Sequence, residues 1–175
     1  MLRTNGQLLL VMDIRTIKQH DYAALSEIYR EGINSRIATF EKDVPPWEVW
    51  DKSHLPNGRI AVYDTDEMMG WAALTGVSNR CIYAGVAEVS VYVGIKFRGQ
   101  GIGEILLNGL IAHSEQAGIW TLQSAIFEEN TRSIKLHQKC GFRMIGFREK
   151  IGKIDGVWKN NVLMERRSKT VGNND

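Results

Sequence analysis

The stretch from Glu88 to Gly118 constrains the fold of this chain most, because the spacing of its apolar side chains changes along it. Up to Val93, valines alternate with polar or aromatic residues, which is the period of a β-strand. From Ile102 onward, apolar residues recur every three or four positions, which predicts a helix, and Gly118 stands where a helix-ending glycine belongs. A strand, a glycine-containing loop and a helix therefore follow one another.

The loop between this strand and helix favours binding of an anion. Gly99, Gly101 and Gly103 let the backbone approach a ligand closely, and the first turn of a helix offers N–H groups without partners. A P-loop would need Lys and Ser or Thr after its last glycine, and a dinucleotide fingerprint counted from Gly99 would need a third glycine where Glu104 stands. Both motifs fail, so the loop indicates either another kind of phosphate site or an ordinary glycine-rich turn.

Composition limits the partners of the chain. With 175 residues it is most simply one domain, and a formal net charge of +2 gives no reason to expect nucleic acid or a membrane surface as a partner. Cys81 and Cys140 have no metal-ligand spacing and suit a reducing cytoplasm, so we expect no metal. The apolar run at residues 8–12 is too short to span a bilayer. Small molecules are the expected partners.

The order of predicted elements defines the fold class. Residues 1–11 are expected to be either a disordered segment or an extension, residues 12–167 a single domain and residues 168–175 a frayed tail. Within the domain the patterns predict a strand near residue 14, helices from Asp21 and from Pro45, and a hairpin at 60–63 and 68–74. Further on they predict a strand at 121–126, a helix at 131–140, and a hairpin at 142–150 and 157–164 around Asp155-Gly156. We therefore expect an α/β (α+β) domain with one mixed, mostly antiparallel sheet and helices on both faces.

Two motifs resemble those of the GNAT (GCN5-related N-acetyltransferase) family. The first is Arg98-x-x-Gly101-x-Gly103 after the strand ending at Val93, and the second runs from Asn130 to Phe142. The resemblance covers about residues 13–166 and implies the GNAT fold, acyltransferase activity and acetyl-CoA as cosubstrate. By the same resemblance, the residues that bind acetyl-CoA are Val91, Tyr92, Val93, Arg98, Gly99, Gln100, Gly101, Ile102, Gly103, Glu104, Asn130 and Ser133.

The second motif would place three polar side chains on one side of a helix. Asn130, Ser133 and His137 are spaced by three and four residues, so a helix projects them together. The resemblance implies that this side faces the cofactor. The alternative is a solvated helix face that begins with Asn130 as its cap.

Amine acetylation requires a group that removes a proton from the acceptor, because an alkylammonium is mostly protonated at neutral pH. Glu88 is the predicted catalytic base, since it lies on the polar face of the strand whose backbone would hold the thioester. A solvent-facing structural carboxylate is the alternative for this residue.

Several features resemble one branch of the family, the phosphinothricin and methionine sulfone or sulfoximine acetyltransferases. These are His137 in place of the tyrosine of many relatives, the strand from Ala87 to Val93, and the segment Thr39-Phe40-Glu41. In this branch the resemblance implies acceptor contacts by the residues Arg36, Phe40, Arg80 and His137.

The expected function is therefore transfer of acetyl to the amine of a small amino-acid-like acceptor by a cytoplasmic homodimer. The alternatives are a protein N-terminal or polyamine acetyltransferase, or a non-catalytic acyl-CoA-binding domain on the same fold. A polyamine site should be lined by extra carboxylates, whereas Arg36 and Arg80 suit an anionic acceptor.

Overall fold

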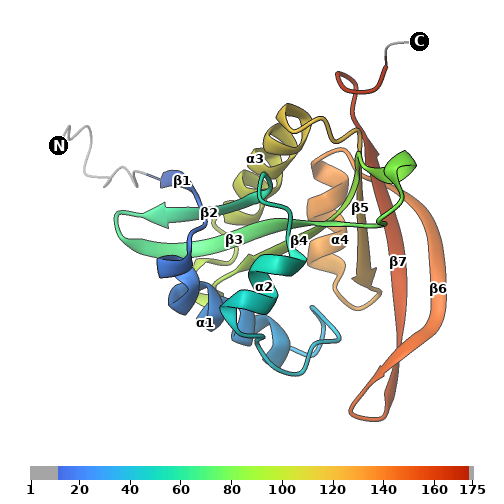
Figure 1. Ribbon diagram of the computed structural model, residues 1–175. Helices are drawn as coiled ribbons and strands as arrows, with labels where there is room; N and C mark the ends of the chain where they lie inside the picture. Colours follow the sequence, from blue (N-terminus) through green and yellow to red (C-terminus); the bar gives the residue numbers. More distant parts are fainter. Residues whose placement is uncertain (1–11, 174–175) are drawn as a thin grey trace, which may run out of the picture.

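A seven-stranded sheet forms the centre of the molecule (Figure 1). The computed structural model describes residues 12–173, so the expected extension at residues 1–11 lies outside the described residues. The strands lie in the order β1-β2-β3-β4-β5-β7-β6, and every neighbouring pair is antiparallel except β4 and β5. Their bounds are β1 (Met12–Thr16), β2 (Arg59–Asp64), β3 (Glu67–Gly76), β4 (Val86–Val93), β5 (Thr121–Phe127), β6 (Arg143–Ile154) and β7 (Val157–Arg167).

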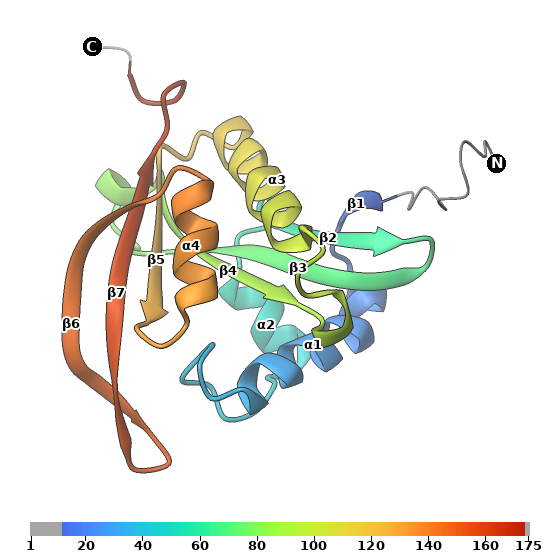
Figure 2. The same cartoon turned by 180° about the vertical axis from the view of Figure 1, so that it is seen from behind.

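Helices cover both faces of the sheet, as the sequence predicted (Figures 1 and 2). On one face α3 (Ile102–Gln116) and α4 (Thr131–Lys139) cover an aliphatic core, in which Leu106 and Leu110 are fully buried. On the other face α1 (Tyr22–Asn34) and α2 (Trp47–Ser53) cover an aromatic core that contains Trp50 and Trp71. Short 3₁₀ segments lie at Gln19–Asp21, Cys81–Tyr83 and Ile95–Phe97.

The sheet opens between its two parallel strands. β4 and β5 pair over three positions, from Val86 opposite Thr121 to Glu88 opposite Gln123, although both strands continue beyond them. From Val89 to Val93 the β4 edge that faces away from β3 therefore has no strand partner among the described residues. An exposed strand edge presents N–H and C=O groups that can bind an extended ligand.

The hairpin of β6 and β7 is longer than the expected 142–150 and 157–164. Pairing continues past two irregularities, between Met144 and Gly146 and between Arg148 and Gly152, which alternation of side chains does not reveal. The predicted turn is confirmed, because Asp155 and Gly156 both have positive φ, at 49° and 82°.

Hydrogen bonds hold the first residues after β7, whereas the sequence predicted a frayed tail at residues 168–175. Ser168 is buried; its N–H donates to the Trp120 carbonyl at 2.8 Å, and its Oγ donates to Glu115 at 2.9 Å. The Arg167 guanidinium donates to the carbonyls of Val171 and Gly172. Tertiary hydrogen bonds therefore hold a segment whose polar composition suggested fraying.

Candidate active site

The loop before α3 presents unpaired backbone donors. Gly99 and Gly101 have φ of 80° and 82°, a conformation that most residues with a side chain adopt at a cost. In the described part of the chain, the N–H groups of Ile102 and Gly103 have no hydrogen-bond partner, as expected for the first turn of a helix. These donors and the positive end of the α3 dipole suit a phosphate.

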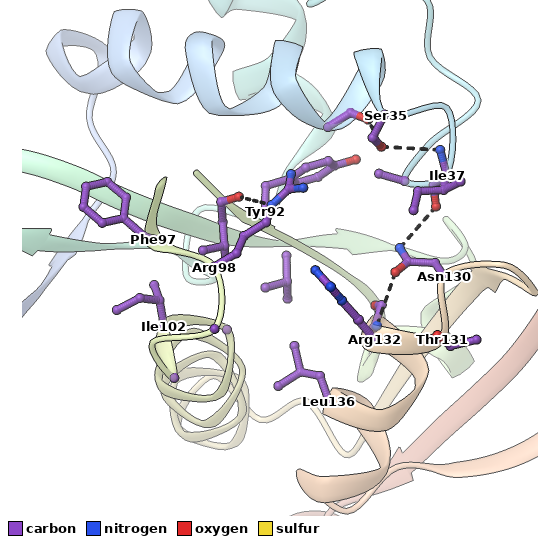
Figure 3. Close-up of a pocket in the computed structure, with 18 of the residues that line it drawn as sticks. Ser35, Ile37, Tyr92, Phe97, Arg98, Ile102, Asn130, Thr131, Arg132 and Leu136 are labelled. Atoms are coloured by element: carbon purple, nitrogen blue, oxygen red, sulfur yellow. Dashed lines mark hydrogen bonds between the residues drawn. The ribbon is translucent and has the colours of Figure 1, made fainter. Parts of the chain in front are cut away.

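These donors border a cavity of about 640 Å³, which we call the loop cavity (Figure 3). Its volume is within the range of about 300–1,000 Å³ that is typical of ligand sites. Arg98 and Arg132 contribute positive charge to its lining. It contains ten of the twelve residues predicted to bind acetyl-CoA, namely Val91, Tyr92, Val93, Arg98, Gly99, Gly101, Ile102, Gly103, Asn130 and Ser133.

The other two predicted cofactor residues do not line the loop cavity. The side-chain amide of Gln100 donates to the Lys96 carbonyl at 2.9 Å. The Glu104 carboxylate forms an ion pair with Lys139 at 2.6 Å, which joins α3 to α4. The side chains of both residues thus have partners outside the loop cavity.

A second cavity of about 300 Å³, the Glu88 cavity, adjoins the loop cavity at the opening of the sheet. The two cavities share five lining residues, which are Ala38, Val91, Tyr92, Asn130 and Ser133. The Glu88 cavity adds Glu88 from β4, Phe127 from β5, His137 from α4 and Asn161 from β7. The predicted base and the predicted cofactor residues thus meet where β4 separates from β5.

Glu88 has the electrostatics of a weak base. Its side chain is reached by solvent, yet the walls of the cavity remove enough water to raise the pKa of its carboxyl group above the ordinary value. The positive charge of Arg148 on β6 opposes this effect and lowers the pKa in part. A raised carboxyl pKa brings the group closer to the range in which a general base works at neutral pH.

His137 is held in one tautomer within the Glu88 cavity. It is 3% exposed, and its Nδ1–H donates to the Ser133 carbonyl at 2.8 Å. Burial lowers the pKa of the imidazole, so the neutral form is favoured. Nε2 is then a hydrogen-bond acceptor, and it has no partner among the described residues.

Asn130 connects the start of α4 to the connection between α1 and α2. Its Oδ1 accepts from the Ser133 N–H at 3.3 Å, which is the cap predicted from the sequence. Its Nδ2 donates to the Ile37 carbonyl at 3.1 Å (Figure 3). The long connection is also held at Phe40, whose ring packs edge-to-face on Phe127 at 4.6 Å.

Of the four residues predicted to contact the acceptor, two line the Glu88 cavity and two do not. Phe40 and His137 line the Glu88 cavity, whereas Arg36 and Arg80 line neither cavity. Arg36 forms an ion pair with Asp155 at 3.2 Å, and the Arg80 guanidinium lies 5.7 Å from the centre of the Tyr83 ring.

Three polar residues of the site were not singled out as site residues by the sequence. Arg148 influences Glu88 from a strand 60 positions later in the chain, and Glu41 enters the Glu88 cavity from the long connection. Asn161 is 6% exposed in the middle of β7. A polar residue in a buried strand is the one signal that could have marked Asn161, since such residues are uncommon in cores.

Comparison with known proteins identifies the family. The model of the acetyltransferase (GNAT) family matches residues 22–142, well over half of the chain. The chain belongs to the GNAT family. This GNAT chain is therefore an acyltransferase of the N-acetyltransferase class, and the predictions of family, fold and enzyme class are confirmed.

Two acetyltransferases with named acceptors are similar to this GNAT chain over most of its length. The chain is 32% identical over 161 residues to phosphinothricin N-acetyltransferase of Alcaligenes faecalis, and the alignment covers 87% of this chain and 81% of that protein. It is 27% identical over 169 residues to L-methionine sulfoximine/L-methionine sulfone acetyltransferase of Salmonella typhimurium, and the alignment covers 88% of this chain and 93% of that protein. The crystal structure of a GNAT phosphinothricin acetyltransferase from Sinorhizobium meliloti in complex with acetyl-CoA superposes with a TM-score of 0.82, at 27% identity, over 89% of this chain and 88% of that one.

The GNAT family uses acetyl-CoA, and the residues present fit that molecule. The unpaired N–H groups at the start of α3 suit its diphosphate, and the unpaired edge of β4 suits its amide-containing arm. Over residues 12–173, no cluster of three or more His, Cys, Asp or Glu side chains is arranged to hold a metal ion. Within the same range, no helix combines the length and apolarity needed to cross a membrane.

Proposed function

We propose that this enzyme transfers the acetyl group of acetyl-CoA to the primary amine of a small amino-acid-like acceptor, and that Glu88 is its general base. One observation supports this most directly: the loop cavity and the Glu88 cavity meet at the opening between β4 and β5. A thioester held along the edge of β4 would lie beside an amine bound near Glu88. Placing the two reactants together supplies much of the catalysis in such a site.

Glu88 would accept the proton that the acceptor ammonium loses, directly or through one water molecule. The amine nitrogen then forms a bond to the acetyl carbonyl carbon, and the bond from that carbon to sulfur breaks. The nitrogen loses its second proton, to the departing CoA thiolate or to solvent, so the products are the amide and the CoA thiol. A backbone N–H on the free edge of β4 would stabilise the charge that develops on the carbonyl oxygen. Neutral His137 cannot donate a proton from Nε2, because its ring proton is on Nδ1 and bound to the Ser133 carbonyl.

The relatives support an amino-acid-like acceptor, since those described above are named for phosphinothricin and for methionine sulfoximine and sulfone. Arg148 is the cation that acts on Glu88, and its side chain is exposed on β6. We propose that Arg148 attracts the carboxylate of the acceptor while the ammonium enters the Glu88 cavity.

The test is release of the CoA thiol from acetyl-CoA in the presence of a panel of amines. We expect steady turnover with small amino acids and slow or no turnover with peptides. A domain that only binds acyl-CoA would bind acetyl-CoA in calorimetry but release no thiol with any amine, and that result would contradict the proposal.

A further inference from the structure

Four side chains that line the Glu88 cavity carry hydrogen-bond acceptors that have no partner among the described residues. Glu41 and Glu88 both line it, and neither carboxylate forms an ion pair or side-chain hydrogen bond with a described residue. His137 Nε2 and Asn161 Oδ1 line the same cavity, are buried and lack partners. Leaving a buried acceptor without a donor costs about 1–3 kcal/mol, which applies to His137 Nε2 and Asn161 Oδ1, whereas solvent reaches Glu41 and Glu88. Two buried acceptors beside two carboxylates indicate a donor-rich ligand.

The charge of the lining points the same way. Among the described residues that line the Glu88 cavity there are two carboxylates and no Lys or Arg. The hydroxyl groups of Thr39, Ser90 and Ser124 can donate or accept but carry no charge. Arg148 acts on Glu88 from outside this lining, whereas Glu41 forms no ion pair with a described residue. Arg36 and Arg80, which would have favoured an anionic acceptor, do not line the cavity.

Glu41 is placed to act as the second charged contact. It follows Thr39 and Phe40 on the connection that packs against β5, and its N–H donates to Thr39 Oγ1 at 3.1 Å. Burial, followed by the nearby Glu41 charge, raises the pKa of Tyr29 beneath the cavity. The backbone contact positions Glu41 without using its carboxylate, which stays available to a ligand.

We propose that Glu41 determines acceptor specificity and that the Glu88 cavity selects acceptors with two ammonium groups, such as dibasic amino acids. One ammonium loses a proton to Glu88 and is then acetylated as the neutral amine, and the other ammonium is bound by Glu41. This inference rests on the proposed function and narrows its acceptor class. Two carboxylates at the cavity would repel an acceptor with an anionic side chain.

The test compares three amino acids that differ in side-chain charge: ornithine, methionine sulfone and glutamate. With the wild-type enzyme and saturating acetyl-CoA, kcat/KM should be at least about tenfold higher for ornithine than for glutamate. In Glu41→Gln, the KM for ornithine should rise about tenfold with kcat little changed, the KM for glutamate should fall, and methionine sulfone should change less than about threefold.

Glu27→Gln is the matched control, because it removes one carboxylate from α1 at a position outside the Glu88 cavity. It should leave all three acceptors unchanged, and thermal melting should show that both variants fold. A wild-type enzyme without charge preference, or an equal effect of Glu41→Gln on ornithine and glutamate, would overturn the inference while leaving the acetyltransferase proposal intact. If no amine released CoA, the proposed function would fail, and calorimetric binding of the same three compounds would still decide between a cationic and an anionic site.

Discussion

Glu88 is the residue at which binding and catalysis can be separated. Glu88→Gln keeps the size of the side chain and removes most of its basicity, so kcat should fall by about 10²- to 10⁴-fold. Affinity for acetyl-CoA, measured by calorimetry, should change little, because the loop cavity lies along Val91 to Gly103 and does not include Glu88. Raising the pH should restore part of the rate, since more acceptor arrives as the neutral amine. A loss of less than about threefold in kcat would assign proton removal to another group or to solvent.

We expect Arg148 to shift the pH range in which Glu88 can accept a proton. Glu88 must be ionised to accept a proton, so kcat/KM should fall as the pH drops through its pKa, which burial raises above the ordinary value and Arg148 lowers in part. Arg148→Met removes the lowering effect, and the acidic limb of the pH–rate profile should move to higher pH. Arg143→Met on the same strand is the control, because Arg143 pairs with Glu165 at 2.7 Å and has no such effect on Glu88. Identical profiles for wild type and Arg148→Met would refute this role.

At the scale of the element, the conformation of the loop between β4 and α3 depends on the positive φ of Gly101. Its φ is 82°, and a Cβ built there would meet no atom within 4 Å, so a substitution acts through the backbone and not through a clash. A residue with a side chain pays about 1–2 kcal/mol in this conformation, and a β-branched one more, which predicts at least a tenfold loss of acetyl-CoA affinity for Gly101→Val. Gly101→Asn should lose less, because Asn tolerates the left-handed conformation. Calorimetry checks the affinities, and equal binding by wild type and Gly101→Val would contradict a phosphate site in this loop.

At the scale of the whole molecule, the hairpin of β6 and β7 carries an apolar surface that the described residues leave uncovered. Phe147, Ile151 and Trp158 are each about half exposed, and β6 is an edge strand. Exposed apolar patches and free strand edges are typical of interfaces. We therefore expect a homodimer formed through this hairpin, with light scattering giving about twice the chain mass of 19.8 kDa. Phe147→Glu should shift it toward monomer, and a wild-type monomer at working concentration would disprove the expectation.

Features that depend on neighbouring residues could be predicted from the sequence. The strand, loop and helix from Glu88 to Gly118, the turn at Asp155-Gly156 and the Asn130 cap all follow from side-chain period and from the backbone preferences of individual residues. Of the ten predicted cofactor residues that line the loop cavity, eight lie in the one continuous segment from Val91 to Gly103. The other two, Asn130 and Ser133, come from the start of α4, and the resemblance to the family named them.

Which distant side chains share a cavity was decided only by the tertiary structure. Glu41, Glu88 and Asn161 come from a connection, a central strand and a late strand, and they meet because β5 pairs with β4 over three positions and then separates from it. No local pattern encodes where two parallel strands diverge, since pairing depends on the packing of helices on both faces of the sheet. Arg36 and Arg80 could not be placed from the sequence for the same reason. Their positions in the chain do not reveal that Arg36 pairs with Asp155 and that Arg80 lies over the Tyr83 ring. The sequence thus determined the local motif of strand, loop and helix, and the charge of the Glu88 cavity was determined by the order and divergence of the strands.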